Sequence, residues 1–214
     1  MSMIAKNNGN TNVDRLPGGV YTAISSAIID IGLQESKQFE KTQRKFMLIW
    51  NVVDEEIEIN GEKLPRTISK EYSFSLHEKS RLRIDLQAWR GKIFTDDELQ
   101  GFDLLNILNR ACQMQIILEE KNGKTFNSVA SIMALAKGQV VQNLASEDIY
   151  HFDLENQETW KNWEKIPNWI KDKIKLAKNY EESGLKEYVE QYEEEIKKQE
   201  NNDNLLAPAD DLPF

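Results

Sequence analysis

Two Asn-Gly dipeptides, at residues 60–61 and 122–123, constrain the fold of this chain more than any other feature. Asn-Gly readily adopts the left-handed backbone of a two-residue type I′ turn, which joins antiparallel strands into a hairpin. Strand-like segments flank both turns and also precede the first one. These segments are residues 20–33, 44–53, 56–59, 66–75, 112–120 and 124–135. Gly32 offers the first strand a bend or bulge. The pattern predicts a mainly β chain.

Helix signals lie between the third strand and the second hairpin. Ser75 and Glu78 have the spacing of a capping box, and apolar residues then recur at helical spacing until Gly91. Thr95 and Glu98 form a second capping box ahead of a short helical segment. The sequence therefore predicts a helix from Ser75 to Gly91, followed by one or two shorter helical turns.

The resulting order is three strands, a helical segment and a two-stranded hairpin. A five-stranded sheet with a helix between its third and fourth strands is the order of the OB-fold, a partly open Greek-key barrel that binds oligonucleotides. Short strands with turn signals also fit another small barrel or a sandwich. The position of the helix favours the OB-fold, and this is the fold class that we predict.

The remainder of the chain divides by composition. The predicted parts are a flexible N-terminal arm at residues 1–17, the OB-fold domain at 18–140, a helical extension at 141–199 and a disordered tail at 200–214. Trp160, Trp163 and Trp169 recur at helical spacing in the extension, and Pro167 divides it into two helices. Packing on the barrel or against a second copy of the chain is preferred for these tryptophans over a lipid-interface helix.

Charge is distributed unevenly along the chain, whose net charge is −9. Residues 147–214 contain 18 of the 36 acidic and 9 of the 27 basic residues, which leaves 18 of each in the first 146 residues. The excess negative charge therefore lies in the last third. The N-terminal part can still present a basic groove to nucleic acid.

Several classes of protein are disfavoured. There is no apolar run of 18 residues, so no membrane span is expected. Cys112 is the only cysteine, which excludes an internal disulfide and fits a reducing cytoplasm. With only His77 and His151 beside it, a Cys/His zinc cluster is not expected.

Catalytic signals are weak. Asp96, Asp97, Glu98 and Asp103 could form a two-metal nuclease site. However, the first three follow the Thr95 cap, where negative charge favours the helix dipole. The sequence has no phosphate-binding loop, nucleophile elbow or zinc-protease motif. We expect no enzymatic activity, cofactor or metal, and a metal-dependent nuclease is kept as a rival hypothesis.

Single-stranded DNA is the ligand that the OB-fold expectation favours, because exposed aromatic side chains stack on bases while Lys and Arg contact phosphates. Burial in the core is the competing role for each aromatic residue. The predicted DNA-binding residues are Arg44, Phe46, Trp50, Arg66, Lys70, Tyr72, Phe74, Lys79, Arg81, Arg83, Trp89, Arg90, Lys92, Lys121, Lys124 and Phe126.

The chain closes with a compact acidic peptide, Asp210-Asp211-Leu212-Pro213-Phe214. Phe214 can fill an apolar pocket of a partner while the terminal carboxylate and the aspartates meet Lys or Arg. Pro213 limits the conformations that binding must freeze. This tip resembles the acidic C-terminal tip of bacterial single-stranded DNA-binding proteins, which recruits replication and repair enzymes. A solvated acidic tail is the alternative.

A second resemblance covers roughly residues 20–175. Its motifs are Ser69-Lys70-Glu71-Tyr72, residues 75–82, Trp89-Arg90-Gly91-Lys92, Phe102-Asp103-Leu104, Gly123-Lys124-Thr125 and Ile166-Pro167-Asn168-Trp169-Ile170. In these motifs the chain resembles a family of phage single-stranded DNA-binding or replication proteins with an OB-type core. The resemblance implies a phage-encoded protein of the host cytoplasm.

These observations predict a protein that coats and protects single-stranded DNA during replication and recombination. Its tip is expected to recruit replication and recombination proteins. The alternative is an OB-fold recombination mediator or replisome adaptor that acts mainly through protein contacts.

Overall fold

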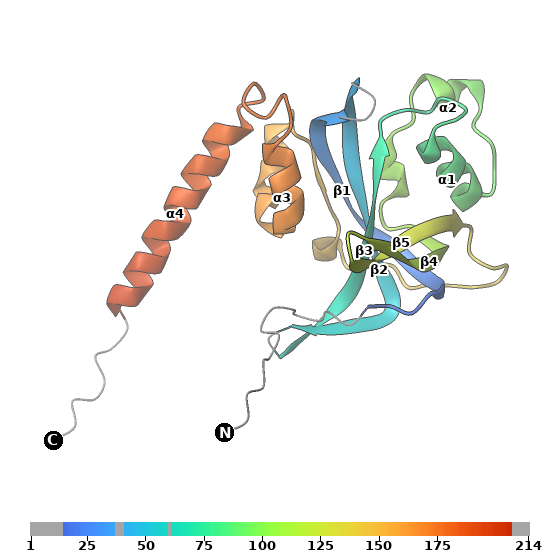
Figure 1. Ribbon diagram of the computed structural model, residues 1–214, viewed down its shortest axis with the longest axis horizontal. Helices are drawn as coiled ribbons and strands as arrows, with labels where there is room; N and C mark the ends of the chain where they lie inside the picture. The colour runs from blue at the N-terminus through green and yellow to red at the C-terminus, as the bar shows by residue number, and fades with distance from the viewer. Residues whose placement is uncertain (1–14, 37–40, 60, 207–214) are drawn as a thin grey trace. The chain divides into compact units, whose positions relative to one another are not determined.

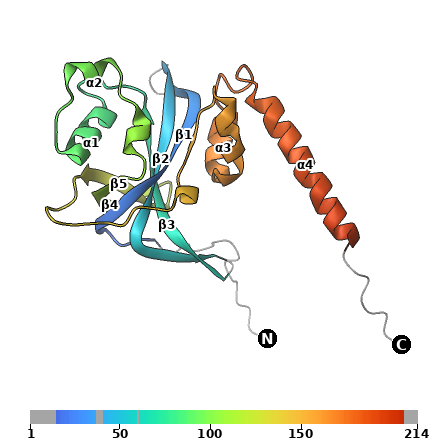
Figure 2. The same cartoon turned by 180° about the vertical axis from the view of Figure 1, so that it is seen from behind.

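A computed structural model describes residues 15–36, 41–59 and 61–206, so the tip at 210–214 and Asn60 of the first turn lie outside the described residues (Figure 1). The fold is mainly β with some helices. Its strands are β1 (Gly19–Ser36), β2 (Lys41–Ile59), β3 (Glu62–Ser73), β4 (Ala111–Lys121), β5 (Lys124–Met133) and β6 (Tyr150–Phe152). The first five form a curled sheet in the order β3-β2-β1-β4-β5, and β6 pairs with β1 (Figures 1 and 2).

The second predicted hairpin is confirmed. β4 and β5 pair in antiparallel register from Lys121 opposite Lys124 to Gln113 opposite Met133, with a register shift between Gln115 and Ile116. Asn122 and Gly123 both have positive φ, 54° and 70°, as a type I′ turn requires. β4 pairs along its other edge with β1, also in antiparallel orientation.

The helical insertion between β3 and β4 begins later than the sequence predicted. It contains α1 (Arg81–Arg90), α2 (Asp96–Gln100) and a short 3₁₀ helix, η1 (Leu104–Ile107). The cap of α1 is Ser80, whose Oγ accepts a hydrogen bond from the Arg83 amide at 3.2 Å. The predicted Ser75 cap is wrong, because the Ser75 carbonyl accepts the Ser80 hydroxyl in a turn that precedes the helix.

The other helix-end predictions in this insertion are confirmed. Gly91 ends α1 in the left-handed conformation that terminates many helices. Thr95 and Glu98 form the reciprocal capping box of α2. α1 packs against β5 and β3, and the Trp89 indole of α1 lies 6.0 Å from that of Trp50 in β2. These elements therefore build one apolar core.

The described chain divides into two compact units. The first contains the residues up to Ala27 and Leu48–Ile149, including the 3₁₀ helix η2 (Ser146–Asp148), and the second contains Ile28–Met47 and the residues from Tyr150 onward. β1 and β2 thus each contribute residues to both units. The predicted boundary near residue 140 made the C-terminal part a separate extension. In the structure, the unit that contains the C-terminal part also contains residues 28–47 of β1 and β2.

The second unit contains η3 (Gln157–Lys165), α3 (Asn168–Lys175) and α4 (Leu185–Leu206). Pro167 separates η3 from α3, as predicted. Trp160 and Trp163 are buried, whereas Trp169 is half exposed. The Leu33 carbonyl of β1 accepts the Lys178 amide at 3.0 Å. The early strands and the C-terminal segment therefore share a backbone contact.

Both ends of the described chain differ from the predicted flexible segments. Leu16, assigned to the N-terminal arm, is buried, and its amide and carbonyl bond the Asn127 side chain at 3.0 and 2.7 Å. Residues 200–206, assigned to the disordered tail, continue α4. No Gly or Pro interrupts Leu185–Leu206, and Asn and Asp lower helix propensity without breaking a helix. None of the described helices has the length and apolarity needed to cross a membrane.

Candidate nucleic-acid interface

Four of the predicted stacking residues belong to the core. Phe46, Trp50, Tyr72 and Trp89 retain 0, 0, 3 and 7 % of their exposure. Rings covered in this way cannot stack on bases without unfolding their surroundings, so we correct these assignments. Phe74 and Phe126, at 43 and 47 %, are the predicted aromatic residues that remain exposed.

Several predicted cations are held by buried partners. Lys70 lies 2.8 Å from the carboxylate of Asp85, which also accepts the Tyr72 hydroxyl at 2.8 Å. Burial, together with the Asp85 charge, raises the pKa of Tyr72 well above its ordinary value. Lys70 and Tyr72 therefore stabilise the attachment of α1 to β3.

Arg44 has an equivalent role in the second unit. Its guanidinium bonds the buried Asp30 carboxylate at 2.7 Å and Asp153 at 2.9 Å. Burial raises the pKa of Asp30, and the hydrogen bond from Arg44 opposes that rise. Arg44 is therefore a structural residue of its unit.

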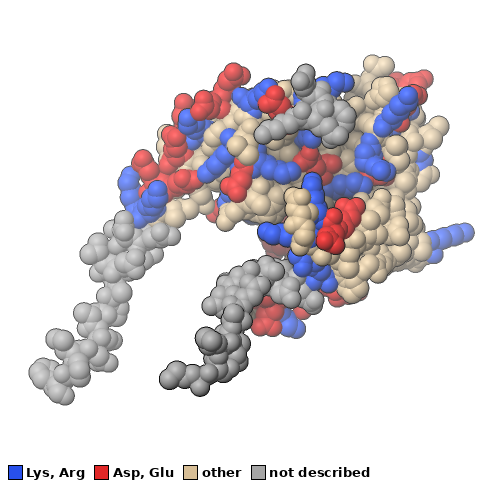
Figure 3. Space-filling model, viewed as in Figure 1, with Lys and Arg blue, Asp and Glu red and all other residues tan. Residues whose placement is uncertain are grey.

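The remaining predicted cations lie in the first unit. Arg66, Arg83 and Arg90 are half-buried, and Lys79, Arg81, Lys92, Lys121 and Lys124 are exposed. Arg83 donates to the Leu76 carbonyl and to Gln87. Figure 3 shows Lys and Arg side chains beside Asp and Glu side chains on the surface, and the part of α4 that it colours carries charges of both signs.

The β4–β5 hairpin brings three predicted residues together. Lys121 lies opposite Lys124, and Phe126 lies opposite Glu119. Because directly opposite and alternate residues share one side of a hairpin, these four side chains form a single surface, which we call the hairpin face. It combines an exposed aromatic ring with two exposed lysines and one carboxylate.

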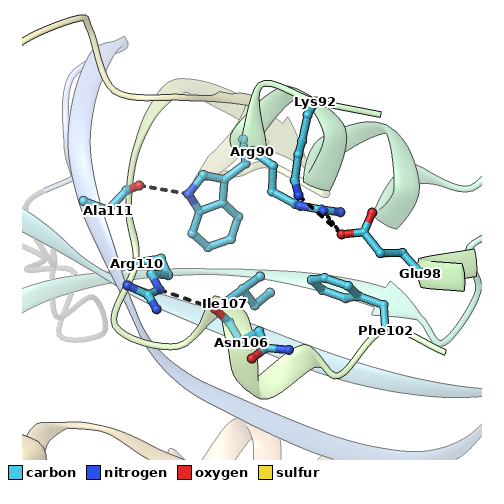
Figure 4. A pocket seen from close by; sticks show the side chains of 9 residues that line it. Arg90, Lys92, Glu98, Phe102, Asn106, Ile107, Arg110 and Ala111 are labelled. Carbon is cyan, nitrogen blue, oxygen red and sulfur yellow. Dashed lines mark hydrogen bonds and ion pairs between the residues drawn. The ribbon is translucent and has the colours of Figure 1, made fainter. Parts of the chain in front are cut away.

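A pocket of about 460 Å³ lies between the end of α1, α2, η1 and the start of β4. Its charged lining residues are Arg90, Lys92, Arg110 and Glu98, a balance of +2, and its aromatic lining residues are Trp89 and Phe102. We call it the basic pocket. Figure 4 shows Arg90 and Lys92 converging on Glu98 beside Phe102, with Arg110 at the other side.

The interior of the basic pocket is held in place by Glu98. One carboxylate oxygen accepts the Thr95 amide at 3.0 Å, and the other accepts Arg90 and lies 3.5 Å from Lys92 Nζ. The hydrogen bond from the Thr95 amide is the main reason why the pKa of Glu98 is lowered, and Arg90 adds to it. The Arg90 guanidinium also lies over the rings of Phe94 and Phe102, 4.5 and 4.9 Å from their centroids.

Sequence reasoning placed Trp89, Arg90 and Lys92 in the site but missed Phe102 and Arg110. Phe102 was noted only as part of a family motif, and Arg110 lies between predicted elements, immediately before β4. The Nε of Arg110 donates a hydrogen bond to the carbonyl of Asn106, in η1, at 3.4 Å. The available signal was a cation six residues after the Phe102-Asp103-Leu104 segment.

Glu98 and Asp103, two of the side chains considered for a metal site, have structural roles. Glu98 serves the cap and the Arg90 ion pair, and Asp103 caps η1 by accepting the Leu105 amide at 2.8 Å. Burial raises the pKa of the Cys112 thiol to about 12. Within residues 15–36, 41–59 and 61–206, no group of three or more His, Cys, Asp or Glu could hold a metal ion.

Comparison of the chain with protein-family models and with curated proteins finds no match.

Proposed function

We propose that this protein binds single-stranded DNA through an OB-type core. The observation that carries the proposal is the strand connectivity. The order β3-β2-β1-β4-β5, with Cα atoms of β3 and β5 within 8 Å of each other and α1 inserted between β3 and β4, is the arrangement expected of an OB barrel.

The hairpin face is the proposed contact surface. In OB-folds the loop between the fourth and fifth strands contacts oligonucleotides, and here that loop carries the hairpin face. Phe126 offers a ring for base stacking, and Lys121 and Lys124 offer contacts to the adjacent phosphates. The buried aromatic residues Trp50, Tyr72 and Trp89 belong to the core that supports this hairpin.

The proposal extends to the biological role that the sequence resemblances imply. The protein, phage-encoded and acting in the host cytoplasm, coats and protects single-stranded DNA in replication and recombination. Its tip at 210–214 recruits replication and recombination proteins. A mediator or adaptor acting mainly through protein contacts is the alternative, and it predicts weak DNA binding with little salt dependence.

Replacement of Phe126 by alanine tests the DNA-binding surface. One lost stacking interaction is worth about 1–3 kcal/mol, so the affinity for oligo-dT should fall about tenfold. The measurement is fluorescence anisotropy of labelled oligo-dT with the full-length chain at several salt concentrations. For the wild type, affinity should fall steeply as salt rises, because phosphate contacts release counterions.

Leu118→Ala is the matched control for this experiment. Leu118 is 49 % exposed against 47 % for Phe126, and it lies on β4 next to Glu119, hence on the other side of the same hairpin. The variant should bind as the wild type does. Equal affinity of the Phe126 and Leu118 variants would exclude the hairpin face, and weak, salt-independent binding by the wild type would favour the adaptor.

Removal of Phe214 tests the role of the tip. Without the aromatic ring, a partner's apolar pocket is left empty, and we expect its affinity to fall at least about tenfold. Surface plasmon resonance with purified host helicases, nucleases and recombinases measures the loss, using oligo-dT affinity as the internal control. Partner binding that is unchanged without Phe214 would contradict recruitment by the tip.

A further inference from the structure

The basic pocket has the size and the mixed lining of a nucleotide site. Its volume of about 460 Å³ falls in the usual range of small-molecule pockets. Trp89, Phe102 and Ile107 supply an apolar wall. Phe102 is half-buried, so part of its ring is available to a flat ligand.

The net charge of the pocket lining favours a phosphomonoester over a phosphodiester. Three cations and one carboxylate leave a balance of +2 among the charged lining residues. A phosphomonoester carries about −1.5 to −2 at neutral pH, because its second pKa is about 6. An internal phosphodiester of a DNA strand carries only one negative charge. The pocket therefore matches a terminal phosphate better than an internal one.

The three cations of the pocket also differ in exposure and in the contacts that hold them. Arg90 is fixed between two rings and Glu98, and its Nη1 has no hydrogen-bond acceptor among the described residues. Lys92 is 63 % exposed at its side chain, and Arg110 is exposed. An anion entering the pocket thus meets one guanidinium that is already held in place and two exposed cations, Lys92 and Arg110.

We propose that the basic pocket binds a nucleotide carrying a 5′-phosphomonoester. Its sugar and base lie on the Phe102 side, and its phosphate lies among Arg90, Lys92 and Arg110. As the end of a bound strand, such a nucleotide would give the protein a preference for 5′-phosphorylated single strands. In this form the inference rests on the proposed function. A free nucleoside monophosphate is the second source of the same chemistry.

The experiment compares oligo-dT bearing a 5′-phosphate with the same strand bearing a 5′-hydroxyl, each labelled at its 3′ end, using the full-length chain. We expect the phosphorylated strand to bind about tenfold more tightly, as added charge-assisted hydrogen bonds predict. The Lys92→Gln/Arg110→Gln double variant should lose this preference. The Lys161→Gln/Lys198→Gln double variant, which removes two exposed charges from the second unit, should retain it.

Thymidine monophosphate separates the two sources and also isolates this inference from the proposed function. Excess thymidine monophosphate, but not thymidine, should abolish the preference for the phosphorylated end. If the preference survives in the Lys92/Arg110 variant, the inference is overturned while strand binding stands. If both ends bind equally to the wild type, or if no strand binds at all, calorimetry with thymidine monophosphate decides. Binding that the double variant loses supports the pocket, and absence of binding overturns it.

Discussion

Replacing Gly32 with alanine is expected to destabilise the second unit by about 3 kcal/mol or more. Gly32 lies in β1 with φ +72°, a conformation that L side chains rarely adopt. An added Cβ would lie 2.7 Å from both the Cβ of Ala177 and Oδ1 of Asn179. Asn179 cannot move freely, because this oxygen accepts the Leu33 amide at 2.8 Å. Strain and overpacking therefore act together.

Hydrogen–deuterium exchange of peptides covering residues 28–36 and 174–180 measures the effect of Gly32→Ala within the second unit, and peptides covering residues 81–100 measure the effect of its control within the first unit. Gly91→Ala is the matched control, since Gly91 has φ +66° but no neighbouring atom within 4 Å of an added Cβ. Its cost should be that of the backbone alone, about 1 kcal/mol. Similar costs for the two variants would show that the contact of Gly32 with the 177–179 segment contributes nothing.

Removing the carboxylate of Asp85 should have an effect of similar size on the first unit. Asp85 is buried in α1, where it accepts the Tyr72 hydroxyl and bonds Lys70, both at 2.8 Å. In Asp85→Ala the Lys70 ammonium, only 16 % exposed, loses its counter-charge. Breaking such a pair from one side costs about 3–5 kcal/mol, and the residual exposure of Lys70 places the expected loss near the lower end.

Urea unfolding followed by tryptophan fluorescence measures the change in the free energy of unfolding. Asp97→Ala removes an exposed carboxylate from the first turn of α2 and should cost less than about 1 kcal/mol. In the double variant Lys70→Met/Asp85→Ala, stability should partly recover, because the unpaired charge is gone. An Asp85 variant as stable as the Asp97 variant would show that the ion pair is dispensable.

Local signals in the sequence predicted the local structure well. The Asn122-Gly123 turn, the Thr95–Glu98 capping box and the break at Pro167 each depend on residues within a few positions of one another. Such interactions are encoded by spacing alone. The Ser75 cap failed because Ser80 offers the same chemistry five residues later, and packing of the turn decides between the two serines.

Burial and long-range contacts were harder to predict. Alternation along a strand shows which residues share a side with Trp50 in β2 or with Tyr72 in β3. It does not reveal which side of a curled sheet is covered. The basic pocket joins α1, α2 and η1 with the start of β4, so Phe102 and Arg110 become neighbours of Arg90 only through the fold. The contact of Gly32 with Ala177 likewise has no local signature.

The sharing of β1 and β2 between the two units has a consequence for biosynthesis. Residues 28–47 leave the ribosome long before residues 150–206, which complete their unit. Until then, apolar side chains such as Ile29, Ile31 and Phe46, which are fully buried in the finished protein, lack part of their covering. The nascent chain therefore exposes these apolar strand segments until residues 150–206 have been translated, and transiently exposed strands of this kind are prone to aggregate.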